Sequence, residues 1–379
     1  MASMELANRL KKAREAIGLT IGEAATKVGF GNYQALSNIE KGEREVKASE
    51  LVALAKAYFC DLNRLLMAES AQEPEVHFLW RKAPAPDKKV AVEADVKHRF
   101  EQYHLLEELL GLVQEGNPRL LSVTPATIRT NPGVDALAGK VSNMLDLGSR
   151  PALALQKVME QTLKTKILYV QLSDFGSAAS TVHPVFGSAV VVNSDEAPWR
   201  INFTLAHELF HILTWDTFSA TEIEQDEALF KDLEKKAERF ASTLLLPERE
   251  VRAELNSRIA DQKLPFSDIV DVAREFGVST QALLYRMANM RLIPWQAADE
   301  AKSDEELLSL DRRMRREVGF EAPESERFIL LAAKCLRKGL LSRGKFAELM
   351  EIDRYDIDDY LEYRGLTEAE GMTFEIVAA

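Results

Sequence analysis

One short run of the sequence places titratable side chains inside an apolar surround. Residues 201–215 read I-N-F-T-L-A-H-E-L-F-H-I-L-T-W, in which His207, Glu208 and His211 form the pattern H-E-x-x-H. Residues four apart on a helix project from one face, so both imidazoles can bind a single tetrahedral Zn²⁺. Glu208 lies about 100° around the helix from His207, which directs its carboxylate at water on the metal. The spacing predicts a metal centre.

The alternative interpretation is a buried helix with two neutral histidines that bond to protein partners. It requires partners for three polar groups in an apolar run, because each unpaired group costs about 1–3 kcal/mol. One metal ion satisfies both histidines at once. We therefore favour the metal centre over the histidine pair.

A catalytic zinc site needs a third protein ligand and an open position. The next long helix is predicted over 227–246, where Glu234 lies within an apolar stripe, about 60° from its centre at Ala237. An acid in such a stripe needs a partner, which favours Glu234 as third ligand over a salt bridge to Lys or Arg. Glu238, one turn on, is expected to accept a hydrogen bond from a ligand histidine. The stripe consists of Phe230, Leu233, Ala237, Phe240, Ala241 and Leu244.

The elements around this pair of helices are less clearly marked. Residues 166–172 and 187–193 are rich in β-branched and aromatic residues and predict two strands. Pro198 suits the first turn of the helix that carries H-E-x-x-H. His183, Tyr285 and Arg286 are further candidates to assist a reaction, but we expect ordinary loop, core and surface roles for them.

Residues 1–68 predict five short helices separated by tight turns. The first ends near Gly18, and Thr20 with Glu23 forms a capping box that starts the second. Gly29 ends the second helix; the third covers about 32–40, the fourth begins at Ser49 and the fifth covers 62–67. A helix, a tight turn and a second helix can present a recognition helix to a major groove.

Charge is unevenly distributed along the chain. The net charge is −12, yet residues 1–68 hold 10 Lys/Arg and 8 Asp/Glu, a balance of +2. The remainder, with 38 and 52, has −14. A negative balance repels phosphate, so any contact with double-stranded DNA is expected within residues 1–68.

The rest of the chain divides by composition. Residues 69–95 contain three prolines without helical period and predict a linker, although 78–80 (F-L-W) is too apolar to lie free in water. A helical pattern resumes from about Val96 to Leu112. We expect a central domain over 96–293 and a helical region over 294–379, in which 341–361 has a second helix-turn-helix rhythm. Its acidic residues favour protein contact or dimerisation over DNA binding.

Composition limits the class of protein. A chain of 379 residues with 46% hydrophobic and 28% charged residues is typical of a globular protein with two or three domains. No apolar run approaches the ~20 residues that span a bilayer, and the N-terminus has no apolar core of a signal peptide. Two distant cysteines suit a reducing compartment, so we expect a cytoplasmic protein.

Residues 1–68 resemble the Xre or lambda-repressor type of helix-turn-helix. The resemblance rests on L-A-N-R-L-K-K-A-R-E-A-I-G-L-T, A-A-T-K-V-G and A-L-S-N-I-E-K-G-E-R. It implies that the start of the third helix faces base edges and that the residues after it lie near phosphates. Where the family often has a glutamine at the start of the second helix, this chain has Ile21. The implied base-contacting residues are Asn32, Tyr33, Gln34, Ser37 and Asn38, and the implied phosphate-contacting residues are Lys41 and Arg44.

Residues 96–293 resemble the ImmA/IrrE family of zinc metallopeptidases. The resemblance rests on R-I-N-F-T-L-A-H-E-L-F-H-I-L, E-K-K-A-E-R-F-A-S-T-L-L-L-P and E-F-G-V-S-T-Q-A-L-L-Y-R-M, in that order. It implies an α+β zincin domain of gluzincin type, with His207, His211 and Glu234 as zinc ligands and Glu208 as general base. It also implies a protein substrate, typically a helix-turn-helix repressor.

Together these features predict a mainly α protein with a small β-sheet. It would combine a five-helix DNA-binding domain, a central zincin domain and a helical C-terminal region. The expected function is a homodimeric transcriptional regulator that cleaves a repressor or itself, with Zn²⁺ or another divalent ion such as Mn²⁺. The alternative is a non-proteolytic transcription factor, or an antitoxin-like regulator, whose zincin domain senses a metal or a signal.

Overall fold

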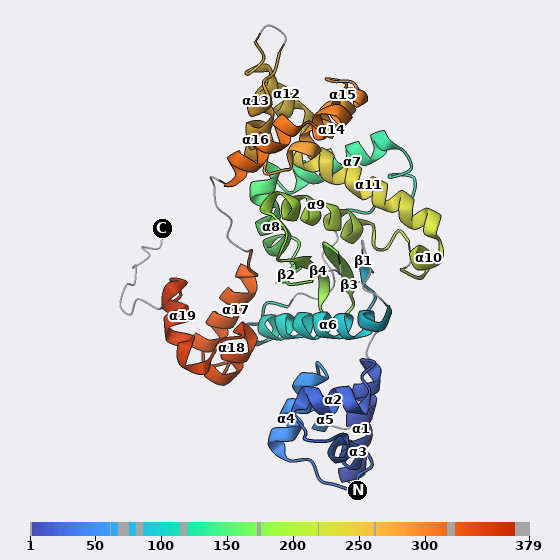
Figure 1. The fold of residues 1–379 in the computed structure, drawn as a ribbon, viewed down its shortest axis with the longest axis vertical. Helices are drawn as coiled ribbons and strands as arrows, with labels where there is room; N and C mark the ends of the chain where they lie inside the picture. Colours follow the sequence, from blue (N-terminus) through green and yellow to red (C-terminus); the bar gives the residue numbers. More distant parts are fainter. Residues whose placement is uncertain are drawn as a thin grey trace, which may run out of the picture. The chain divides into compact units, whose positions relative to one another are not determined.

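The computed structural model describes residues 2–60, 62–66, 76–80, 86–113, 120–172, 176–218, 220–260, 263–316 and 323–367. Helices dominate these residues, and one four-stranded sheet lies among them (Figure 1). The predicted fold class, mainly α with a small sheet, is confirmed. The chain divides into two compact units, residues 1–100 with 116–324 and residues 101–115 with 325–379. No described helix is long and apolar enough to cross a membrane.

The five helices predicted for residues 1–68 are present in the described residues. They are α1 (Ala2–Ala16), α2 (Ile21–Val28), α3 (Tyr33–Glu40), α4 (Ala48–Ala57) and α5 (Leu62–Leu66). The capping box forms as predicted: the Thr20 amide donates to Glu23 Oε2 over 2.8 Å, and the Glu23 amide donates to Thr20 Oγ1 over 3.2 Å. Gly29 ends α2 with φ 83°, a left-handed conformation that glycine adopts without strain.

A buried ion pair ties the first and third helices together. The Arg14 guanidinium donates to both carboxylate oxygens of Glu40, over 2.7 and 3.0 Å, and its third nitrogen donates to the Leu19 carbonyl over 2.6 Å. The hydrogen bond with Glu40 raises the pKa of Arg14 above its ordinary value. Apolar residues of all five helices, including Leu10, Leu36 and Leu54, surround this pair and form the domain core.

The central sheet contains β1 (Leu79–Trp80), β2 (Lys166–Val170), β3 (Ala178–His183) and β4 (Gly187–Asn193), in the order β1-β3-β4-β2. β3 pairs antiparallel with both β1 and β4, whereas β2 runs parallel to β4. Figure 1 shows α9 (Pro198–Thr214) on one side of the sheet and α6 (Pro86–Leu109) on the other. Strand residues such as Ile167 and Val190 join Leu205 and Leu209 of α9 in one core.

Further helices complete this core. They are α7 (Asn131–Met144), α8 (Pro151–Gln161), α10 (Ala220–Gln225), α11 (Glu227–Leu245), α12 (Glu248–Asn256), α13 (Phe266–Glu275), α14 (Thr280–Asn289), α15 (Trp295–Lys302) and α16 (Glu305–Arg316). Ala298 of α15 and Leu307 of α16 lie in the same hydrophobic cluster as α9. The compact unit therefore continues beyond residue 293, where the sequence analysis ended the central domain.

The structure also differs from the expected linker over 69–95. Residues 79–80 form β1 at the sheet edge, with Phe78, Leu79 and Trp80 buried, and α6 begins at Pro86 instead of near Val96. The physical reason is that a two-residue strand has no period to detect, while proline is well suited to the first turn of a helix. Residues 69–75 and 81–85 lie outside the described residues.

The second compact unit combines the end of α6 with α17 (Glu326–Arg337), α18 (Arg343–Met350), a 3₁₀ turn η1 (Arg354–Asp356) and α19 (Ile357–Tyr363). The Tyr103 ring packs on Phe328 with centroids 5.3 Å apart. Arg327 donates to the Glu107 carboxylate over 2.6 Å and to the Tyr103 hydroxyl over 3.2 Å. The predicted helical C-terminal region thus contains α15 and α16 of one unit and α17 to α19 of the other.

Candidate metal centre and DNA-binding face

The helix that carries H-E-x-x-H lies largely inside the central core. α9 begins with Pro198 in its first turn, and residues 204–211 are all buried. His207, Glu208 and His211 are 1%, 2% and 6% exposed. Apolar neighbours on both sides fix this helix in place, so the three polar side chains have a rigid backbone beneath them.

The second helix of the site is α11, and its start is set by a cap. The Asp226 carboxylate accepts hydrogen bonds from the amides of Ala228 and Leu229, over 2.9 and 3.0 Å. The predicted apolar stripe of α11 packs on α9, with the Phe210 and Phe240 rings 5.6 Å apart. This packing turns Glu234, which lies within the stripe, toward the two histidines.

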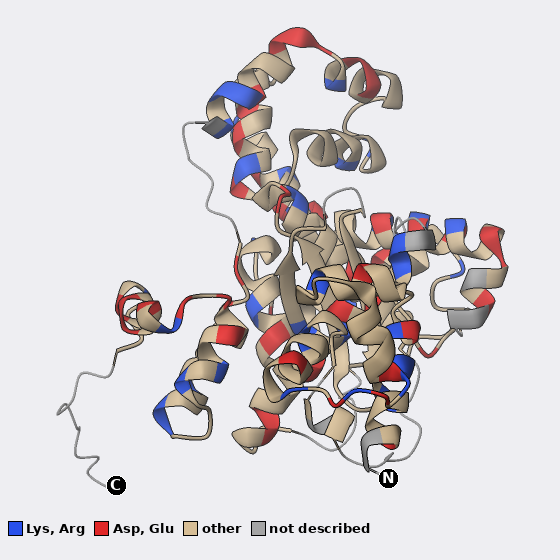
Figure 2. Ribbon diagram, turned by 60° about the horizontal axis from the view of Figure 1, so that its bottom comes forward, with Lys and Arg blue, Asp and Glu red and all other residues tan. Residues whose placement is uncertain are grey.

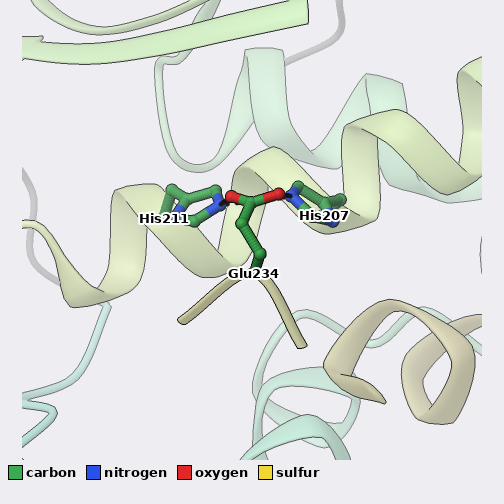
Figure 3. A group of neighbouring side chains, drawn as sticks. All are labelled: His207, His211 and Glu234. Carbon is green, nitrogen blue, oxygen red and sulfur yellow. Dashed lines mark hydrogen bonds and ion pairs between the residues drawn. The ribbon is translucent and has the colours of Figure 1, made fainter. Parts of the chain in front are cut away.

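Three side chains from these helices meet at one point (Figure 3). His207 Nε2 lies 3.3 Å from Glu234 Oε2, and His211 Nε2 lies 3.0 Å from Glu234 Oε1. The two histidine Nε2 atoms are 3.2 Å apart. These three residues form the candidate metal site of the described chain, with all ligand atoms within 4.8 Å of one another.

The separations fit a tetrahedral ion. Two ligand nitrogens that each lie about 2.0–2.1 Å from zinc in a tetrahedral site are about 3.3 Å from each other. The observed Nε2–Nε2 distance of 3.2 Å is close to this value. The site thus fits Zn²⁺ in donor type as well as in spacing, because two imidazoles and one carboxylate are ligands that zinc commonly takes.

The charge of the carboxylate ligand is secured by its neighbours. Burial alone raises the pKa of Glu234, but hydrogen bonds from His207 and His211 lower it more strongly, and the net result is a pKa well below the ordinary value. The carboxylate is therefore ionised across the physiological range. An anionic oxygen between two imidazoles is suited to a divalent cation.

Two buried polar atoms beside the site have no hydrogen-bond partner among the described residues: Glu208 Oε2 and His207 Nδ1. An unpaired buried carboxylate oxygen is costly, and this one belongs to the residue next to His207. A water molecule held in the candidate site would give it a partner. This observation fits the role predicted for Glu208.

The predicted DNA-contacting residues gather on and around α3. Asn32 caps α3, because its side chain accepts a hydrogen bond from the Ala35 amide over 3.1 Å. Tyr33 is 59% exposed, Ser37 is half-buried, and the face includes three further exposed side chains, Gln34, Asn38 and Lys41. The face predicted to read DNA is therefore accessible.

Arg44 is more constrained than the sequence indicated. Its Nη2 donates to Glu50 Oε1 over 2.7 Å, and its guanidinium lies 5.9 Å from the centre of the Phe30 ring. A phosphate contact by Arg44 would compete with the carboxylate of Glu50. No local sequence pattern predicts this pair, because Glu50 belongs to the next helix.

Comparison with known proteins agrees with both predicted domains, the helix-turn-helix and the ImmA/IrrE-like domain. Residues 10–65 match the family model of a helix-turn-helix, and residues 160–288 match that of the IrrE N-terminal-like domain. The chain joins a helix-turn-helix to an IrrE N-terminal-like domain. The predicted fusion of an Xre-type head with an ImmA/IrrE-like domain is thereby confirmed.

Similarity beyond these models is distant. A Mycobacterium tuberculosis transcriptional regulator is 16% identical, with a TM-score of 0.31; the match covers 49% of this chain and about half, 51%, of that one. The apo form of the competence regulator ComR from Streptococcus vestibularis is 15% identical, with a TM-score of 0.17, over 97% of this chain and 94% of that one. No curated protein matches the chain in sequence.

In the central core, α11 is fixed by contacts that the sequence analysis missed. Asp135 of α7 accepts from Arg239 Nε over 2.9 Å and from the Thr243 hydroxyl over 2.9 Å. Arg286 of α14 donates to the Thr243 hydroxyl over 3.0 Å and to the Leu246 carbonyl, at the end of α11, over 2.9 Å. These bonds hold the helix that presents Glu234.

The remaining candidates have protein partners, and His183 lies at a strand end instead of in the expected loop. His183 ends β3; its Nδ1 accepts from the Val185 amide over 3.2 Å, and its ring stacks on Phe186. Tyr285 contacts Trp295 and accepts a hydrogen bond from Lys302 over 2.7 Å. Glu238 is exposed on α11, and its support of a ligand histidine stays a prediction.

Proposed function

We propose that this protein is a DNA-binding transcriptional regulator whose IrrE N-terminal-like domain is a zinc-dependent endopeptidase. The observation that carries the proposal is the convergence of His207, His211 and Glu234 beside a buried Glu208 with an unpartnered oxygen. A purely structural metal site has no use for such a base. The protein substrate is a helix-turn-helix repressor or the chain itself, and the protein acts as a homodimer in the cytoplasm.

Two imidazoles and the Glu234 carboxylate would hold the metal. A zinc ion there supplies a Lewis acid that makes water acidic near neutral pH. The carboxylate of Glu234 offsets part of the ionic charge, while the apolar walls of α9 and α11 keep the electrostatic attraction strong.

Glu208 moves the proton in this scheme. Its buried carboxylate accepts a proton from the attacking water as the oxygen adds to the peptide carbonyl. The same carboxyl then donates that proton to the departing amine nitrogen as the C–N bond breaks. One residue acts as base and then as acid, so each turnover returns Glu208 to its starting state.

The first experiment separates metal binding from catalysis. Purified wild-type protein and Glu208→Gln are compared for zinc content and for cleavage of candidate repressors and of the chain itself under inducing conditions. We expect both proteins to hold zinc and only the wild type to cleave. A wild-type protein that holds zinc but cleaves neither itself nor any candidate under these conditions would overturn the endopeptidase proposal.

The second experiment tests the DNA-binding half. A mobility shift of the protein's own promoter is expected to weaken with salt, because phosphate contacts release counterions. The shift should persist in Glu208→Gln and be lost in Gln34→Ala/Ser37→Ala. Lys140→Ala, which changes an exposed lysine of α7, is the matched control and should keep the shift. Equal binding by all variants would contradict recognition through α3.

A further inference from the structure

The second compact unit exposes a basic stripe along α17. Leu330, Lys334, Arg337 and Lys338 follow one another at intervals of four, three and one residues, which places them on one helix face. The opposite face, with Phe328, Ala332 and Cys335, is buried in the unit. Leu330 is 51% exposed although it is a large aliphatic residue. We call these four residues the basic stripe.

A second stripe with the same spacing follows the 3₁₀ turn and α19. Tyr355, Asp359, Glu362 and Tyr363 are all exposed, the two tyrosines at 91% and 87%, while Ile357 and Leu361 are buried on the other side. In Figure 2 the helix that leads into the C-terminal trace shows red segments among tan ones. We call these four residues the acidic stripe.

Two charges of each stripe have no ion pair among the described residues. Among the described residues, Lys334, Lys338, Asp359 and Glu362 take part in no ion pair, whereas charged residues next to them do. Neighbouring pairs are Arg343 with Asp358, joined by two bonds of 2.9 Å, and Lys345 with Glu348 at 3.0 Å. Arg343, Asp358, Lys345 and Glu348 are thus paired within the unit, whereas these two sets, of opposite sign, face solvent.

We propose that the two stripes bind each other between two copies of the chain. About a twofold axis, the basic stripe of one copy would lie on the acidic stripe of its partner, and the same contact would form a second time. Lys334 and Lys338 would face Asp359 and Glu362, and the exposed leucine and tyrosines would supply apolar area. Tyrosine is among the residue types that contribute most to interfaces.

A second copy explains the surface better than other partners do. DNA would meet the carboxylates of Asp359 and Glu362 and be repelled by them. A different protein of one charge sign would use one stripe and leave the other unexplained. A copy of the same chain carries a stripe of opposite charge for each of the two, and it accounts for both. This surface extends the proposed function, since it gives the expected homodimer a contact outside the DNA-binding domain.

The test uses charge reversal in the full-length chain and analytical ultracentrifugation over a range of concentrations. Lys334→Glu/Lys338→Glu makes both stripes of a copy negative, and Asp359→Lys/Glu362→Lys makes both positive. Each variant alone should dissociate, with a dissociation constant at least about tenfold higher than that of the wild type, because like charges then face each other. An equimolar mixture of the two should restore the dimer, since their stripes are again complementary.

Controls separate this contact from misfolding and from net charge. Recovery in the mixture requires both variants to be folded. Lys140→Glu/Lys157→Glu changes net charge by the same amount as the basic-stripe variant, at exposed lysines of α7 and α8, and should leave the dissociation constant unchanged. A monomeric wild type, equal dissociation constants for all proteins, or a mixture that does not recover would each overturn the proposal.

Discussion

Glu234 is the residue on which the metal centre depends most directly, since its two carboxylate oxygens each contact one histidine. Glu234→Gln keeps the shape of the side chain but removes the negative charge. Loss of a residue that only supports a ligand raises a metal dissociation constant by about 10–100-fold. We expect the zinc dissociation constant of Glu234→Gln to rise by more than this. Titration against a competing chelator measures this constant.

Glu238→Gln is the matched control, because Glu238 lies one turn further along the same helix. If Glu238 supports a ligand histidine, its loss should weaken zinc binding by about tenfold. The decisive result is that Glu234→Gln weakens zinc binding more than Glu238→Gln does. A Glu234→Gln protein that binds zinc as tightly as wild type would remove Glu234 from the ligand set.

Residue types and spacing were sufficient to predict the three side chains that meet at the candidate metal site. His207 and His211 share a helix face by sequence spacing alone, and an acid in an apolar stripe pointed to Glu234. Spacing along one helix does not reveal which side chains of other helices each residue contacts. Asp135 accepts hydrogen bonds from Arg239 and Thr243, and Glu50 binds Arg44. Neither acid lies on the same element as its partners, so no local pattern predicts the contact.

At the scale of a helix, the capping box of α2 gives a test with a defined pH dependence. Thr20→Ala should lower the free energy of unfolding of the helix-turn-helix domain by about 1 kcal/mol at neutral pH. Hydrogen bonds from the Thr20 side chain and amide lower the pKa of Glu23. A carboxyl whose pKa is lowered in the folded state stabilises that state at pH values above its ordinary pKa. This stabilisation is lost as the pH falls through the lowered pKa.

Denaturation in urea at several pH values measures the difference between wild type and Thr20→Ala, which should shrink in acid. Thr26→Ala is the control, because the Thr26 hydroxyl donates to the Gly22 carbonyl within the same helix and caps nothing. It should change the free energy of unfolding by less than about 0.5 kcal/mol. Equal effects of both substitutions would show that the box adds no stability.

The contact between α1 and α3 gives a second test at this scale. Arg14→Met leaves the buried Glu40 carboxylate without its partner and should cost about 3–5 kcal/mol of unfolding free energy. Arg14→Met/Glu40→Leu removes both charges and should be much closer to wild type, because no charge remains buried alone. Urea denaturation distinguishes the two cases. A double variant as unstable as the single one would mean that packing, not charge, dominates.

Elements with a clear period were predictable, and short ones were not. Helices α2, α9 and α11 followed from caps and apolar spacing. β1 has two residues and forms only because β3 offers an edge, which is a property of the folded sheet. The hydrophobic core also extends past residue 293, because α15 packs on α14 and α16 packs on α13.

At the scale of the whole molecule, the helix-turn-helix domain and the IrrE N-terminal-like domain have separate hydrophobic cores. Separate cores predict separate unfolding transitions. Zinc binds only the folded metal site, so zinc at 100 times its dissociation constant should stabilise the IrrE N-terminal-like domain by about 2.7 kcal/mol. Arg14→Met should move only the transition of the other domain. Calorimetry with and without zinc resolves the two effects; a single transition that shifts under both changes would show that the domains unfold as one cooperative unit.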